Sequence, residues 1–184
     1  MIINPFLELG DIDILDREFK VPVYYNNKVK IFRLDYELLS TEFVDLFVDI
    51  SKSKPTNIQL FYTPPRSSNQ NIHIDGSSGN GMWAINKVID GTNIATMNWY
   101  SVNPEYVPSV NSSGIDTKYT LYSADNVSKT HEYILIGTVL VKIGIPHNIN
   151  NCDNIPRWCV SIRPEKYHFS YDEMYNRMLR KNNT

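Results

Sequence analysis

The pattern of apolar and polar residues divides the chain into a short N-terminal part and a longer strand-rich part. Between residues 36 and 51 apolar side chains recur at three- and four-residue spacing, which predicts an amphipathic helix. Residues 21–25 and 28–32 flank the pair Asn26-Asn27, and this pattern predicts a β-hairpin. Further β-rich runs, separated by Gly, Pro, Asn and Ser, predict strands over residues 57–62, 83–89, 95–102, 119–122, 133–141 and 157–163.

Many short strands and one outer helix predict a mainly β fold, a compact antiparallel sandwich or barrel with the helix packed outside it. We expect the polar stretch 103–117 to form a flexible loop at a rim. Ser170-Tyr171-Asp172-Glu173 fits a capping box and predicts a short C-terminal helix. At 184 residues the chain is expected to be a single domain, in which residues 1–56 and the helix within 166–184 accompany a core of residues 57–165.

Composition narrows the classes of function. A net charge of −2 and a pI near 6.1 give no reason to expect nucleic acid or an anionic membrane as a partner. The longest strongly apolar run is about half as long as a bilayer-spanning helix, and the N-terminus lacks the features of a signal peptide. Cys152 and Cys159 are too few for a disulfide framework and are expected to be free thiols. Together these features predict a soluble, cytoplasmic protein.

The tripeptide His73-Ile74-Asp75 is the most informative local motif. In an extended segment residues i and i+2 project to one face, so the imidazole and the carboxylate can both point into a barrel. With His147, at the end of a later strand segment, they form the set of two histidines and one carboxylate that holds Fe(II) on one side and leaves the other positions open. The alternatives are a surface turn and an ordinary loop histidine. The other histidines lack such a setting and are expected to be structural: His131 and His168.

The run from residue 157 to residue 163 is polar or small on one face. Arg157, Cys159, Ser161 and Arg163 alternate with apolar residues, a pattern unusual for a core strand unless that face lines a pocket. A buried arginine needs an anion, and its planar fork matches a carboxylate. The alternative is a structural salt bridge to an acidic side chain. Arg163, near the strand end, fits this alternative better than Arg157 does.

Three segments of the chain resemble the Fe(II)/2-oxoglutarate-dependent dioxygenases: His73-x-Asp75, residues 146–151 beginning Pro-His, and residues 156–162. The likeness is closest to the small members found in phage and marine microbial genomes, some of them prolyl-hydroxylase-like. Residues 83–86 and 97–100 also look like that group's strands between the two histidines. The resemblance covers approximately residues 57–165 and suggests a phage-encoded protein acting in a bacterial host.

The resemblance implies a double-stranded β-helix, a jelly-roll or cupin-like fold with supporting helices. His73, Asp75 and His147 would bind Fe(II). Arg157 would pair with the distal carboxylate of 2-oxoglutarate, with Ser161 as a helper on the same face. Dioxygen would be the second co-substrate, succinate and CO2 the products, and ascorbate an optional reductant.

By the same resemblance Tyr62 would touch the co-substrate carboxylate, while Asn86 and Trp99 would line the substrate pocket. The alternatives are a half-buried strand aromatic for Tyr62 and strand packing for Trp99. The chain departs from its relatives at Cys159, where a Ser or Thr is common, and in the Gly- and Ser-rich residues 76–81.

The resemblance leaves the substrate open between a peptidyl proline or other protein side chain, a free amino acid, a small metabolite and a nucleobase. The carboxylate of Asp75, in place of the Ala or Gly of halide-binding relatives, favours hydroxylation over halogenation. Two other hypotheses stand beside it: a non-catalytic jelly-roll binding or structural module that retains the ligands, and a cupin-like metalloenzyme without 2-oxoglutarate. The sequence does not predict an oligomeric state.

Overall fold

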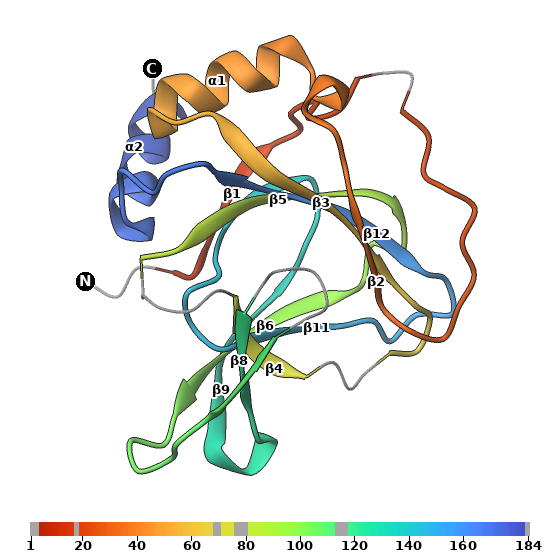
Figure 1. The fold of residues 1–184 in the computed structure, drawn as a ribbon, viewed down its shortest axis with the longest axis vertical. Coiled ribbons are helices and arrows are strands. Elements are labelled where there is room, and N and C mark those ends of the chain that lie inside the picture. Colours follow the sequence, from red (N-terminus) through yellow and green to blue (C-terminus); the bar gives the residue numbers. More distant parts are fainter. Residues whose placement is uncertain (1–3, 17–18, 68–70, 76–80, 113–117, 183–184) are drawn as a thin grey trace.

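Two antiparallel β-sheets face each other and form most of the molecule (Figure 1). The computed structural model describes residues 4–16, 19–67, 71–75, 81–112 and 118–182. The first sheet has six strands in the order β1 (Phe6–Gly10), β10 (Thr138–Lys142), β5 (Trp83–Gly91), β12 (Arg157–Pro164), β3 (Pro55–Thr63) and β2 (Lys30–Arg33). The second sheet has six strands in the order β7 (Ser109–Ser112), β8 (Lys118–Tyr122), β4 (Ile72–Asp75), β11 (His147–Asn150), β6 (Thr96–Val102) and β9 (Val127–Ile134).

The chain crosses repeatedly between the two sheets. β3, β5, β10 and β12 belong to the first sheet, whereas β4, β6 and β11, which separate them in sequence, belong to the second. This alternation joins strands that are far apart in sequence and is the arrangement of a jelly roll. The prediction of a mainly β, jelly-roll sandwich with helices is therefore confirmed.

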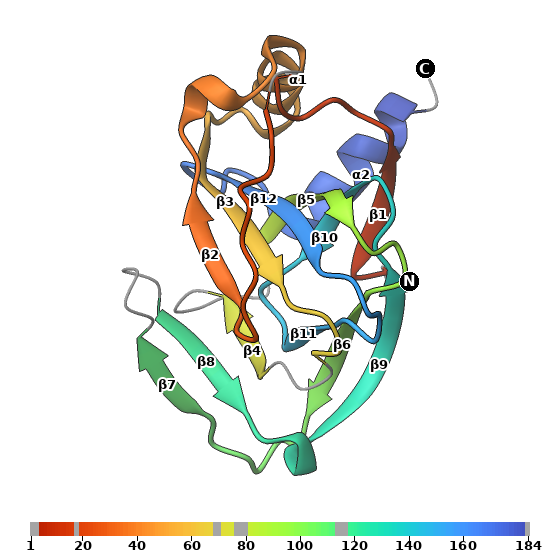
Figure 2. The same cartoon turned by 90° about the vertical axis from the view of Figure 1, so that its right-hand side faces the viewer.

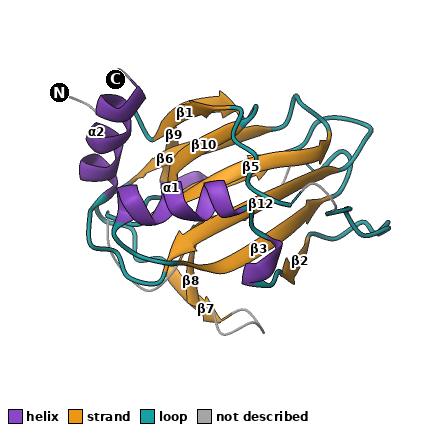
Figure 3. Cartoon of the chain, turned by 90° about the horizontal axis from the view of Figure 1, so that it is seen from above, coloured by secondary structure: helices purple, strands orange, loops and turns teal. Residues whose placement is uncertain are grey.

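Two α-helices lie on the outer face of the first sheet, α1 (Thr41–Ser51) and α2 (Tyr171–Asn182). In Figure 2 the second sheet lies below the first and the helices above it, and Figure 3 shows α1 lying across the first sheet. The described residues also contain the short 3-10 helices η1 (Tyr36–Leu38) and η2 (Ala124–Asn126). Within the described residues, no helix combines the length and the apolar character that crossing a membrane requires.

Each helix begins at a side-chain cap. The Ser40 hydroxyl accepts the N–H of Phe43 at 3.2 Å, and α1 ends where Lys52 takes a left-handed conformation with φ 56°. At the start of α2 the predicted capping box is present. The N–H of Ser170 donates to Glu173 at 2.7 Å, and the N–H of Glu173 donates to the Ser170 hydroxyl at 3.4 Å.

The interior consists of two apolar clusters on opposite faces of the first sheet. The helix-side cluster joins Phe43 and Phe47 of α1 and Met174 of α2 to sheet residues such as Leu60 and Val160. The second cluster fills part of the space between the sheets and is formed by Ala84, Met97, Trp99, Leu135, Val139, Val141 and Ile143. The first sheet is therefore buried on both faces.

The structure differs from the sequence pattern where a tertiary contact replaces a local one. Residues 21–25 form no strand, and β2 pairs with β3 instead, while the Asn26 side chain accepts the N–H of Lys28 at 3.1 Å. The predicted helix over 36–51 is divided into η1 and α1. The predicted strand over 133–141 is broken at Gly137, whose φ of 67° turns the chain from β9 into β10.

Two further expectations concern a loop and the cysteines. The stretch 103–117 contains β7 rather than a loop alone, and its residues 113–117 lie outside the described part of the chain. Cys152 and Cys159 are both free, the first exposed and the second buried, as predicted.

Candidate metal centre

β4 and β11 are neighbours in the second sheet, and they bring the three predicted ligands together. His73 and His147 are register partners across the two strands, and Asp75 lies two residues further along β4 on the same face. One donor atom from each of the three residues lies within 4.8 Å of the others. Two segments separated by more than seventy residues in sequence thus form one cluster.

Backbone hydrogen bonds orient both imidazoles toward the carboxylate. Nδ1 of His73 lies 2.8 Å from the carbonyl oxygen of Asn71, and Nδ1 of His147 lies 2.8 Å from that of Ile145. The Nε2 atoms face Asp75, at 3.3 Å from Oδ1 for His73 and 3.7 Å from Oδ2 for His147. A histidine that donates one ring N–H to a carbonyl presents its other nitrogen as a metal ligand.

Arg163 forms an ion pair with the carboxylate of this cluster. Its Nη2 donates to Oδ2 of Asp75 at 2.9 Å, and both side chains are largely shielded from solvent. Burial favours the neutral acid, but the charge of Arg163 and the hydrogen bonds from both histidines outweigh it and hold the pKa of Asp75 well below its usual value. Burial also acts to lower the pKa of His73, and the hydrogen bond and charge of Asp75 outweigh it and raise that pKa.

This donor set suits a divalent transition metal. Two ligands that each lie about 2.1 Å from an ion, at right angles, are about 3 Å apart. The imidazole nitrogens lie slightly further than this from the carboxylate, 3.3 Å from Oδ1 for His73 and 3.7 Å from Oδ2 for His147. Two imidazoles and one carboxylate on one side, with the remaining positions open, are characteristic of Fe(II) in oxygenases. The three residues therefore form a candidate metal site whose donors fit such an ion.

The inner face of β12 adds a polar wall to the space between the sheets. Trp158, Val160 and Ile162 belong to the helix-side cluster, so the alternating residues face the opposite way, toward the second sheet. The inward-facing residues, all buried, are Arg157, Cys159, Ser161 and Arg163. The predicted polar face is therefore present.

Arg157 is the least satisfied side chain on this wall. It is 1 % exposed, and its Nε and Nη2 have no hydrogen-bond partner among the described residues. The Oδ1 atom of Asn86, a register partner of Ser161 on β5, is likewise buried without a partner there. Burial raises the pKa of the Cys159 thiol in spite of the neighbouring Arg157 charge, so this thiol stays neutral. Buried polar atoms are ordinarily hydrogen-bonded, so these groups point to a polar ligand.

Tyr62 and Trp99 take different positions relative to the cluster. Tyr62 is the register partner of Trp158, packs on it with ring centroids 5.0 Å apart, and donates its hydroxyl to the backbone oxygen of Asn26 at 3.2 Å. It therefore lies on the helix side of the first sheet, opposite to Arg157. Trp99, by contrast, is the register partner of His147 on β6; it is completely buried and donates its indole N–H to the carbonyl of Lys142 at 2.9 Å.

Sequence reasoning did not identify Tyr167 as a neighbour of the cluster. Its hydroxyl donates to the carbonyl of Trp83 at 3.1 Å, and the phenol interacts electrostatically with Arg163 and Asp75. Burial raises the pKa of Tyr167 to about 12. No pattern in the Tyr-His-Phe linker indicated this contact, because it depends on how the chain turns after β12.

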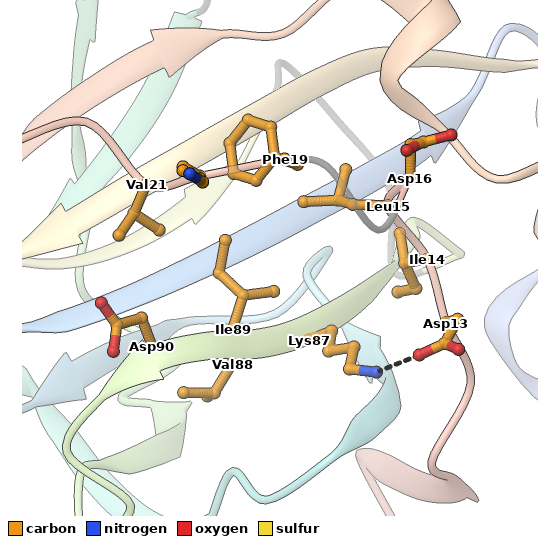
Figure 4. Close-up of a pocket in the computed structure, with 11 residues that line it drawn as sticks. Asp13, Ile14, Leu15, Asp16, Phe19, Val21, Lys87, Val88, Ile89 and Asp90 are labelled. Atoms are coloured by element: carbon orange, nitrogen blue, oxygen red, sulfur yellow. Dashed lines mark ion pairs between the residues drawn. The ribbon is translucent and has the colours of Figure 1, made fainter.

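The cleft in Figure 4 is separate from this centre. It has a volume of about 480 Å³ and lies between the N-terminal segment and β5. Its lining mixes apolar residues such as Ile14, Phe19 and Ile89 with charged ones, and its Lys87 already contacts Asp13 at 3.9 Å. Within the described residues, the histidines and carboxylates that could hold a metal gather at the other site. Comparison with protein-family models and with curated proteins finds no match to this chain.

Proposed function

We propose that this protein is an Fe(II)- and 2-oxoglutarate-dependent oxygenase that hydroxylates a C–H bond. The observation that carries the proposal is the combination of a His73, Asp75 and His147 cluster with the buried guanidinium of Arg157, whose Nε and Nη2 have no hydrogen-bond partner among the described residues. Both border the space between the two sheets of one jelly roll. A metal ligand set alone would support any metal-binding module, whereas the added buried cation calls for an anionic ligand.

The charges of the site support an anionic co-substrate. A divalent ion would add two positive charges to a buried region in which Arg163 already pairs with Asp75. Arg157 adds a further positive charge and has no ion pair among the described residues. Because uncompensated buried charge is strongly unfavourable, this net positive charge favours an anionic ligand. 2-Oxoglutarate meets this need with one carboxylate at the metal and one at the guanidinium, a pairing that arginine makes with a two-bonded fork.

Each residue then has a defined part. His73, Asp75 and His147 would hold the ion from one side, and Arg157 and Ser161 would orient the distal carboxylate. When bound, Fe(II) with 2-oxoglutarate and dioxygen supplies the oxidising chemistry, with succinate and CO2 as products. Trp99 and Met97 contribute a closed apolar wall that keeps bulk water from the interior. A peptidyl side chain or a small molecule in the cytoplasm is the proposed substrate, on the resemblance alone.

Anaerobic addition of Fe(II) and 2-oxoglutarate to the metal-free protein tests the proposal. We expect a visible charge-transfer band that is absent in His73→Ala and that requires at least ten-fold more 2-oxoglutarate in Arg157→Met. Arg33→Met is the matched control, because Arg33 is exposed and has no ion pair among the described residues, and it should leave the band unchanged. A wild-type protein without the band contradicts the proposal. Iron binding without the band or succinate formation would instead identify a binding module or a cupin-like metalloprotein.

A further inference from the structure

The ion pair between Arg163 and Asp75 is the contact of the metal centre whose role the proposed function does not explain. We propose that Arg163 is the positioning residue of this centre: it engages one oxygen of Asp75 and leaves the other as a single-oxygen metal ligand. This role presupposes the proposed metal site. It concerns how the chain's own residues prepare that site before the metal binds.

The contacts distinguish the two oxygens of the carboxylate. Oδ2 accepts the Nη2–H of Arg163 at 2.9 Å and lies 3.7 Å from Nε2 of His147, whereas Oδ1 lies 3.3 Å from Nε2 of His73 and accepts no bond from the arginine. Carboxylates bind metals through one oxygen or through both. With Oδ2 engaged, Asp75 would offer a bound ion one oxygen beside the imidazoles of His73 and His147. A single-oxygen carboxylate would leave more of the ion accessible to a co-substrate and dioxygen than a two-oxygen one.

The pair also connects a short strand of the second sheet to a long, central strand of the first. β4 has four residues, which pair along their length with β8 but meet β11 at a single register pair. β12 has eight residues, lies in the interior of the first sheet and is paired along its length with β3 and β5. Arg163 extends from β12 across the space between the sheets to Asp75 on β4. It therefore fixes the carboxylate relative to the sheet that also carries Arg157.

Two other roles for Arg163 predict different results. If the arginine only competed with the metal for Asp75, its removal would strengthen metal binding. If the arginine only stabilised the fold, its removal would weaken metal binding to the same extent whether or not residue 75 is a carboxylate. A positioning role predicts weaker metal binding that depends on Asp75. Partners of metal ligands of this kind change metal affinity by about 10–100-fold when they are removed.

The experiment is a titration of the metal-free protein with Co(II), followed by visible absorption and calorimetry. Wild type, Arg163→Met, Arg163→Lys, Asp75→Asn and the double variant Asp75→Asn/Arg163→Met are compared, with Arg33→Met as the control. We expect Arg163→Met to weaken Co(II) binding about 10–100-fold in the wild-type background and less than about three-fold beside Asp75→Asn. Arg163→Lys should recover part of the loss, because it keeps the charge but not the planar fork.

The outcomes separate this role from the proposed function. Equal losses in both backgrounds, or tighter Co(II) binding in Arg163→Met, overturn the positioning role while the metal site stands. A wild-type protein that does not bind Co(II) overturns both. Should Arg163→Met fail to fold, as judged by circular dichroism, Arg163→Lys carries the test: a loss of about three-fold or more that disappears beside Asp75→Asn supports the role, and an unchanged affinity contradicts it.

Discussion

Strand β12 has two buried faces of opposite character. On the helix side, Trp158 and Val160 belong to the apolar cluster that includes the aromatic residues of α1. On the inner side, Arg157 and Arg163 are as deeply buried as their apolar neighbours. Burying an apolar side chain contributes about 1.5–3 kcal/mol to stability, whereas burying an unpaired charge is unfavourable. One face of the strand thus stabilises the fold, whereas the arginines on the other face are better explained by ligand binding.

The largest effect is expected on the helix side. Phe47→Ala removes a completely buried ring that packs against Phe43 and Trp83. We expect the free energy of unfolding to fall by about 3–5 kcal/mol in urea denaturation. In the fraction that stays folded, Co(II) affinity should be unchanged, because the metal ligands lie on the other side of the sheet. Co(II) affinity that falls in proportion to stability would show that the two faces are not independent.

Ligand addition tests the inner face in the opposite direction. Co(II) with 2-oxoglutarate at about one hundred times the dissociation constant should stabilise the folded protein by about 2.7 kcal/mol, since the unfolded chain lacks the site. A chelator should reverse the resulting rise in Tm. The control is His147→Ala, in which no rise is expected. A similar rise in this variant would place the ligands somewhere other than the candidate centre.

Removing the inner charge should stabilise the ligand-free protein. Arg157→Met replaces a buried guanidinium, unpartnered at Nε and Nη2, with an apolar chain of similar length. We expect the free energy of unfolding to increase by about 1–2 kcal/mol while the stabilisation by 2-oxoglutarate is lost. Urea denaturation with and without the ligands measures both quantities. A marked loss of stability in the ligand-free variant would mean that Arg157 has a structural partner.

The contrast between the two faces also explains what could be predicted from the sequence. The alternation along residues 157–163 and the His-x-Asp spacing are local patterns, and both are present in the structure. The face of Tyr62 depends on its register with β12, where a shift by one residue reverses the side. The partner of Arg163 lies 88 residues away on the other sheet. It could be identified only once the way the chain crosses between the sheets was known. Sequence indicated that Arg163 would pair with an acid, but not that the acid would be a metal ligand.

The smallest effect is expected at the capping box of α2, on the helix side. The hydrogen bond from the Ser170 hydroxyl, followed by that from its backbone N–H, lowers the pKa of Glu173. A carboxylate whose pKa is depressed on folding adds stability above its unfolded pKa, and that stability is lost as the pH falls through the folded value. The unfolding free energies of wild type and Glu173→Ala, measured in urea from pH 7 to pH 3, should therefore converge with acid by a small amount. This convergence should shrink in the Ser170→Ala background, because the principal donor to the carboxylate is then missing. A difference independent of pH would indicate that Glu173 acts through helix propensity alone, and the helix side would then carry no charge-dependent contribution at this cap.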